Sequence, residues 1–121
     1  MTHARSLTHV ATIAGALTAS GVDDVLVTSD QLEVPNALEA GVTAVCVLPP
    51  RRDFPTYTIE DTVWTVLVAA GPIQDTPTAW ESIDAVTEAL RIPLELTSAE
   101  PAAYQSPHGG EFPAYTLTFT E

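Results

Sequence analysis

Lysine is missing from this sequence of 121 residues, and four Arg carry all of its permanent positive side-chain charge. Asp and Glu together number 16, so the formal net charge is −12. Proteins that bind nucleic-acid backbones neutralise phosphates with Lys and Arg, and no basic cluster here is larger than Arg51 and Arg52. The composition therefore argues against nucleic-acid binding, and an acidic membrane surface would also repel the chain.

Cysteine is nearly absent as well. Cys46 is the only one, which excludes an internal disulfide and a cluster of thiolate metal ligands. It lies among Val residues in an apolar run, where a thiol acts as a small buried hydrophobe rather than as a nucleophile. This usage fits an intracellular, reducing environment.

Long apolar runs are also missing, because no stretch approaches the ~20 residues that span a bilayer. We therefore expect a soluble protein. The run from Arg5 to Gly21 has the outline of a secretory signal, but Thr and His residues interrupt it. Its apolar positions recur at helical spacing instead, at Leu7, Val10, Ala14 and Leu17. This rhythm predicts a helix over residues 6–20, with Ser6 as its N-cap and Gly21 at the C′ position.

Patterns for catalysis or cofactor binding are missing too. His3, His9 and His108 lie far apart and match no metal-binding spacing. Residues 106–110 resemble the His-Gly-Gly loop of some esterases, but the Gly-x-Ser-x-Gly turn of such enzymes is not present. The glycines are too widely spaced to cradle a phosphate, and the paired acids are typical of solvated turns. We therefore predict no enzyme activity, no metal and no cofactor.

The strongest pattern that is present lies between residues 57 and 90. Residues 57–70 predict a strand that is apolar on both faces in its second half, which makes it the central strand of a sheet. A turn at Gly71 and Pro72 follows, and then a helix opened by Thr76 and Pro77. Thr78 and Glu81 have the spacing of a capping box. The helix has one apolar stripe, formed by Ala79, Ile83, Val86 and Leu90, with Trp80 beside it.

The remaining elements are shorter. Residues 25–28 and 42–48 predict strands, and the second should pair antiparallel with the central strand. Residues 34–36 interrupt regular structure, residues 37–40 could form one helical turn closed by Gly41, and residues 51–56 are expected to be a loop. Two further extended segments are expected at 94–97 and 115–119, separated by a loop over 99–112.

These elements predict an α+β fold, a single domain over residues 1–121 in the order α-β-β-β-α-β-β. The sheet would be mostly antiparallel, with about four to five strands and the second helix on one face. The C-terminal strand would be an edge strand, or would face solvent on its Thr side. Because two helices cover one face only, apolar surface is left over, and either loops or another subunit must cover it.

The chain resembles the tail terminator proteins of long-tailed phages and of related gene-transfer particles. The resemblance spans nearly the full length. It rests on the N-terminal helix, the strand ending in Pro49 and Pro50, and the runs 63–68, 79–86 and 115–119.

The resemblance implies a homo-oligomeric ring, typically a hexamer, that caps the finished tail tube and stops its polymerisation. The ring would also present the surface that joins the head. Its partners would be other copies of the chain, the major tail tube protein and the head-tail connector protein. The genome would pass through its channel without sequence-specific binding. The protein would assemble in the host cytoplasm and reside in the virion tail.

Two sets of residues are candidates for these contacts. In so acidic a chain, Arg51 and Arg52 are suited to an acidic patch on a neighbouring subunit or tail protein. The candidate interface residues are Arg51, Arg52, Asp53, Phe54, Gln105, His108 and Phe112. An acidic channel wall lets DNA slide, and the candidates for lining it are Asp23, Asp24, Glu60 and Asp61.

Two other functions remain open at this point. A head-tail connector or tail-completion protein of similar size is the nearer alternative. A small-ligand-binding or enzymatic α+β domain, with its site in the 99–112 segment, is the more distant one.

Overall fold

A computed structural model describes residues 2–22, 25–57, 59–70, 76–107 and 109–120. The predicted α+β class is confirmed. The elements are α1 (Thr2–Ala19), β1 (Val25–Thr28), the 3₁₀ turn η1 (Gln31–Glu33), α2 (Val34–Glu39), β2 (Thr43–Val47), β3 (Arg51–Thr56), β4 (Ile59–Ala69), α3 (Thr76–Arg91), β5 (Ser98–Gln105) and β6 (Glu111–Thr120).

One sheet of six strands organises the described chain. Its path is β1-β2-β4-β6-β5, and β3 pairs with β4 outside this path. The β1–β2 pair is parallel, and the other pairs are antiparallel. The central place predicted for residues 57–70 is confirmed, because β4 pairs with β2, β3 and β6. The predicted antiparallel pairing of the strands near 42–48 and 57–70 is confirmed as well.

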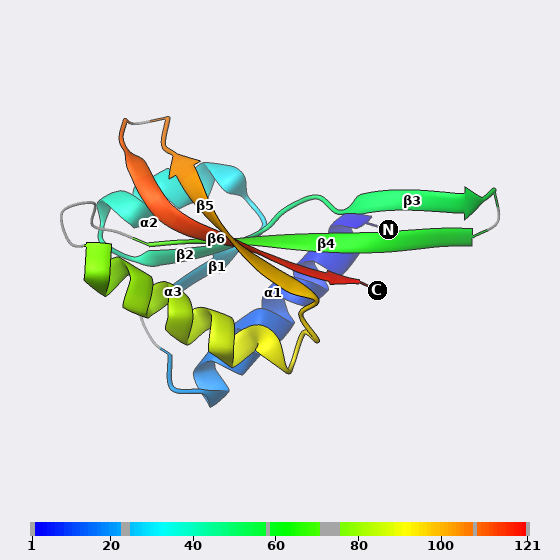
Figure 1. Ribbon diagram of the computed structural model, residues 1–121, viewed down its shortest axis with the longest axis horizontal. Coiled ribbons are helices and arrows are strands. Elements are labelled where there is room, and N and C mark those ends of the chain that lie inside the picture. The colour runs from blue at the N-terminus through cyan, green and yellow to red at the C-terminus, as the bar shows by residue number, and fades with distance from the viewer. Residues whose placement is uncertain (1, 23–24, 58, 71–75, 108, 121) are drawn as a thin grey trace.

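Helices α1 and α3 lie on one face of the sheet and α2 lies on the other (Figure 1). The main core forms under α1 and α3, where Trp64, Val66 and Val68 of β4 are fully buried. The α3 stripe predicted from the sequence is confirmed, since all four of its residues have 0% exposure: Ala79, Ile83, Val86 and Leu90. Alternation along β4 thus directs one row of side chains toward these two helices.

A second, smaller core lies under α2. Its buried members come from α2, β2, β4 and β6, and they are Val34, Ala37, Leu38, Ala44, Cys46, Ala69, Phe112 and Ala114. The expectation of two helices overlooked this third one, which covers part of the other face. Both faces of the sheet centre are therefore covered within one chain.

Two glycines end helices as their positions require. Gly21 has φ +74°, and its neighbour Val22 donates its N–H to the carbonyl of Leu17 at 2.9 Å. Gly41 has φ +77°, and Val42 donates to Ala37 at 2.9 Å in the same way. Both are Schellman caps, in which glycine occupies the left-handed conformation without strain. The predicted roles of Gly21 and Gly41 are confirmed.

Helix α1 begins earlier than predicted. Ser6 lies inside the helix and is buried, so its assignment as N-cap was wrong. The buried stripe is also rotated, because Ile13 and Leu17 are buried whereas Leu7 is 51% exposed. Positions 6, 13 and 17 form the buried row, and Leu7 and Ala14 lie beside this row instead of within it.

The starts of the other two helices needed similar correction. Thr78 is the third residue of α3, so a capping box beginning there was wrong, while the expected turn at Gly71 and Pro72 lies outside the described residues. Residues 34–36 do not interrupt structure, because Pro35 lies in the first turn of α2, where a missing N–H costs nothing.

The largest error concerned strands with exposed side chains. Residues 94–97 form no strand, because Glu95 has φ +53° in the turn that closes α3. The expected 99–112 loop is instead mostly the β5–β6 hairpin, so β6 lies between β4 and β5. The edge position predicted for the C-terminal strand was therefore wrong. β5 takes that edge, where the missing N–H of Pro101 is tolerated.

Candidate assembly surface

The expected loop at residues 51–56 is strand β3, and it forms a hairpin with the first part of β4. We call residues 51–57 and 59–61 the arm. All six residues of β3 are exposed, as are Glu60 and Asp61. The arm extends beyond the rest of the sheet and past both chain ends (Figure 1). Its described side chains are therefore open to solvent.

The register of the arm explains how Pro55 is accommodated. Arg51 pairs with Val63 and Asp53 pairs with Asp61, but the register shifts between Asp53 and Thr56. Such a bulge adds a residue to one strand. Proline is tolerated there because β3 pairs on one side only, so the ladder loses no obligatory donor.

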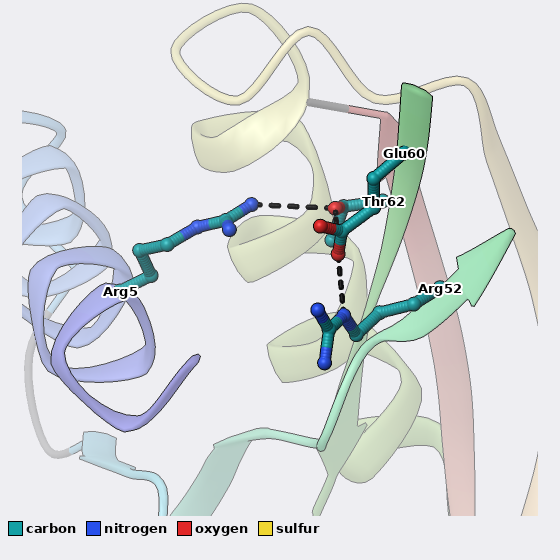
Figure 2. A network of polar contacts seen from close by, with 4 residues as sticks. All are labelled: Arg5, Arg52, Glu60 and Thr62. Carbon is teal, nitrogen blue, oxygen red and sulfur yellow. Dashed lines mark hydrogen bonds and ion pairs between the residues drawn. The ribbon is translucent and has the colours of Figure 1, made fainter. Parts of the chain in front are cut away.

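A polar network holds the arm where it joins the core. Arg52 donates from Nε to Oε1 of Glu60 across the hairpin, and the hydroxyl of Thr62 donates to the same oxygen at 3.3 Å. Arg5 of α1 donates to Thr62 Oγ1, also at 3.3 Å. Figure 2 shows Arg5 and Arg52 approaching Glu60 and Thr62 from two different elements. Thr62 is 4% exposed, so β4 enters the core at this residue.

This network sets the charge state of Glu60. The hydrogen bond from Arg52 lowers the pKa of the Glu60 carboxyl, while partial desolvation opposes it and the charge of Arg52 adds to the lowering. The same hydrogen bond raises the pKa of Arg52. Both groups are therefore ionised at neutral pH, and they form an exposed pair whose contribution to stability is small.

The arm also carries exposed aromatic rings. The guanidinium of Arg52 lies 5.4 Å from the ring centroid of Phe54, which is 59% exposed. Tyr57, at the turn, is 99% exposed. On the other face Arg51 forms an exposed ion pair with Asp53 at 3.3 Å. Four of the sequence-predicted interface residues thus lie together on the arm, from Arg51 to Phe54.

The other predicted interface residues lie elsewhere. Gln105 donates to Glu111 at 3.0 Å near the turn of the β5–β6 hairpin, which lies far from the arm (Figure 1). Phe112 is 6% exposed and belongs to the core under α2. His108 lies outside the described residues. The predicted set therefore does not form one surface.

Of the candidate channel-lining acids, Asp23 and Asp24 lie outside the described residues. Glu60 and Asp61 are both exposed on the arm. Glu60 is paired with Arg52. Asp61 is the register partner of Asp53, so this pair of positions concentrates negative charge.

The sequence did not indicate a hollow that lies between α2 and the first strand. We call it the groove. Its volume is about 440 Å³, and it is lined by Leu26, Glu33, Asn36, Ala37 and Val42. Leu32, which precedes Glu33, is 82% exposed. The groove is therefore apolar, with one carboxylate and one amide available for polar contacts.

Cys46 belongs to the core under α2, and its thiol is buried. Burial raises the pKa of Cys46 to about 11, and the negative charges of Asp30 and Glu33 contribute in the same direction. A neutral buried thiol is a poor nucleophile, as the sequence analysis expected.

The described part of the chain contains no group of three or more His, Cys, Asp or Glu residues that could hold a metal ion. None of its helices combines the length and apolar character needed to cross a membrane.

Comparison with known protein families found none that matches the chain, and comparison with curated proteins found no matching sequence.

Proposed function

We propose that this chain is a structural virion protein of the tail terminator kind. It closes into a ring that caps the tail tube, stops its polymerisation and provides the surface that joins the head. The observation that carries the proposal is the arm, a strand pair exposed on both faces beside a sheet centre that is buried on both faces.

An exposed strand pair gains little stability from its own chain. An isolated two-stranded hairpin is marginal in water, and here the root of the arm is tied to the core through Thr62 and Arg5. Exposed aromatic and Arg side chains are the residue types enriched in protein interfaces. The arm is thus suited to contact a second protein surface, as a ring or a tube cap requires.

The charge of the chain suits a ring around DNA. With a net charge of −12 per copy, a closed ring concentrates negative charge near its channel. DNA carries one negative charge per ~1.7 Å of its axis, so an acidic wall would not retain it. Asp61 and Glu60 are the described candidates for that wall.

The proposed partners are other copies of the chain in a hexameric ring, the tail tube protein and the head-tail connector protein. The proposed location is the virion tail after assembly in the host cytoplasm. A head-tail connector or tail-completion role would use the same exposed arm, and the tube experiment below separates these roles.

Electron microscopy of the purified protein, alone and mixed with polymerising tail tube protein, tests the proposal. We expect closed rings, and tubes that stop growing with a ring at one end. A connector would form rings that leave tube growth unaffected. Monomers both in solution and on assembled tails would overturn the proposal.

A further inference from the structure

Strand β1 forms one end of the sheet path and has an open backbone edge. It pairs with β2 on one side only. Among the described residues, no backbone group outside β2 is hydrogen-bonded to the backbone of residues 25–28. An edge strand of this kind presents a row of unpaired N–H and C=O groups on its open side.

The other two edge strands carry features that hinder the addition of a further strand. β5 contains Glu100 and Pro101, and β3 contains Pro55, a register shift and three charged side chains. Charges, proline and bulges are the usual means by which proteins protect sheet edges. Residues 25–28 are Val, Leu, Val and Thr, which have high strand propensity and no charge. The edge of β1 is therefore the one suited to accept an added strand.

The groove lies directly beside this edge. Leu26 of β1 and Val42 form its strand side, and Glu33, Asn36 and Ala37 form its helix side. Helix α2 packs over the core that β2 and β4 contribute to, so its cover stops before the outermost strand and leaves a hollow there. The volume of about 440 Å³ is within the ~300–1,000 Å³ typical of binding pockets.

We infer that the edge of β1 and the groove together bind an extended segment of a partner protein, which adds a strand to β1 and places one apolar side chain in the groove. In this mode of recognition, main-chain hydrogen bonds give affinity, and pockets for alternate side chains give specificity. A hollow alone fits many molecules, but a hollow beside open strand groups fits an extended backbone. The inference does not depend on the ring or on the terminator role.

The charge around the groove defines the partner further. Residues 25–42 contain Asp30, Glu33 and Glu39 and no basic residue, a net charge of −3. Glu33 lines the groove and is exposed. Side chains two positions apart in a strand lie on the same face, so a Lys or Arg two residues from the apolar side chain would lie on the groove side, near Glu33. The partner segment is therefore apolar and basic at alternate positions.

An NMR titration with a synthetic peptide tests this contact. The capped peptide Ser-Lys-Thr-Leu-Thr-Lys-Ser has one Leu and two Lys on the same face when it is extended. We expect it to shift the amide signals of residues 25–28 and 33–42 and to slow hydrogen exchange at alternate amides of β1. The amides of β5, at the other end of the sheet path, should not change.

Two N-methylated forms of the peptide separate strand addition from simple occupation of the groove. One carries N-methyl groups on the Lys and Leu residues, and the other carries them on the Ser and Thr residues. The amides of a strand point alternately to its two sides, so only one form blocks the hydrogen bonds to β1. We expect that form to lose binding and the other to retain it.

Protein variants test the charge and the hollow. Glu33→Gln should weaken binding about two- to fivefold, as expected for one exposed charge pair. The matched control, Glu81→Gln, makes the same change in net charge at an exposed position of α3 and should leave binding unchanged. Asn36→Trp fills the groove from an exposed position of α2 and should abolish binding. Urea unfolding of each variant checks that it is folded.

Each contrary outcome would overturn the inference. Equal weakening by Glu33→Gln and Glu81→Gln would show attraction to net charge alone. Binding by both N-methylated peptides would show a side chain held without strand addition. Protection of the β1 amides that rises with protein concentration would show that a second copy occupies the edge. No shift in residues 25–28 at millimolar peptide would show that the edge does not accept a strand.

Discussion

Strand β4 contains two regions with opposite environments. Residues 59–61 belong to the arm, where Glu60 and Asp61 are exposed, whereas Trp64, Val66 and Val68 in the same strand are fully buried. Residues 59–61 pair with β3 on one side only, whereas Val66 and Val68 pair with β2 on one side and β6 on the other. The two regions also differ in cover, because α1 and α3 lie over the inner region, and none of the described helices lies over the outer one (Figure 1).

This contrast separates two uses of one strand. The inner region stabilises the fold, since each large buried side chain contributes about 1.5 to 3 kcal/mol. The outer region contributes little to that total, and its exposed side chains are available for contact with other molecules. Substitutions in the inner region should therefore change stability, and those in the outer region should change assembly.

The largest expected effect is that of Trp64→Ala. Trp64 is fully buried and packs edge-on against His9, with ring centroids 4.5 Å apart. Truncating a buried Trp costs about 3 to 5 kcal/mol, a large share of the stability of a small domain. Urea unfolding should show this loss or yield insoluble protein.

Two matched variants sharpen this test. The indole N–H of Trp64 has no hydrogen-bond partner among the described residues, so Trp64→Phe should cost less than Trp64→Ala. Phe54→Ala on the arm should stay within about 0.5 kcal/mol of wild type. Equal losses for Trp64→Ala and Phe54→Ala would contradict the division of β4.

The same division explains which elements could be predicted from sequence. Residues 57–70 and the stripe of α3 were recognised because burial imposes a periodic apolar pattern. β3 and β5 were missed because most of their side chains are exposed, so no such pattern exists. Pro55 and Pro101 then suggested loops, although edge strands tolerate proline.

The candidate site was predictable only in part. Arg51 and Arg52 stood out by charge, but their place on a projecting strand depends on pairing with residues 62–63, which no local pattern reveals. The groove was missed because Pro35 suggested an interruption instead of the first turn of α2. Long-range pairing and proline context are tertiary properties, and local propensity does not encode them.

A second prediction concerns Cys46 in the core under α2, where the expected effect is intermediate. Burial raises the pKa of its thiol to about 11, whereas an unfolded thiol ionises near ~8.5. The contribution of this burial is thus fully present below the unfolded pKa and is lost as pH rises toward 11. A shift of this size corresponds to about 3 kcal/mol.

Urea unfolding between pH 8 and about 11 measures this loss. Cys46→Ala is the control. Its stability should fall less steeply over the same pH range because the thiol is gone, and the fall that remains comes from other groups that titrate at alkaline pH. In native protein at pH 8, a thiol reagent should modify Cys46 only as fast as the chain opens. Rapid modification of the folded protein would contradict the burial of this thiol.

The smallest effect on folding is expected for the double substitution Arg51→Glu and Arg52→Glu on the arm. Both ion pairs, Arg51 with Asp53 and Arg52 with Glu60, are exposed, so their loss should leave the unfolding midpoint close to wild type. The pKa of Glu60 should rise, because the hydrogen bond that lowers it is removed. NMR titration of the Glu60 carboxyl measures this rise.

The same double substitution should affect assembly more than it affects folding. The substitutions change the net charge of the arm from −1 to −5, because two positive charges become two negative ones in a hairpin that already holds Asp53, Glu60 and Asp61. An arm of this charge would be repelled by other copies of a chain whose net charge is −12, and like charges in contact weaken association. Ring formation and docking on tail tubes should therefore be reduced, and added salt should partly restore them because it screens exposed charges. The control, Arg91→Glu, reverses an exposed charge at the end of α3 and should leave assembly unchanged. Normal rings and normal tail length with the double variant would show that the arm contributes its hairpin to the fold but not its charge to an interface.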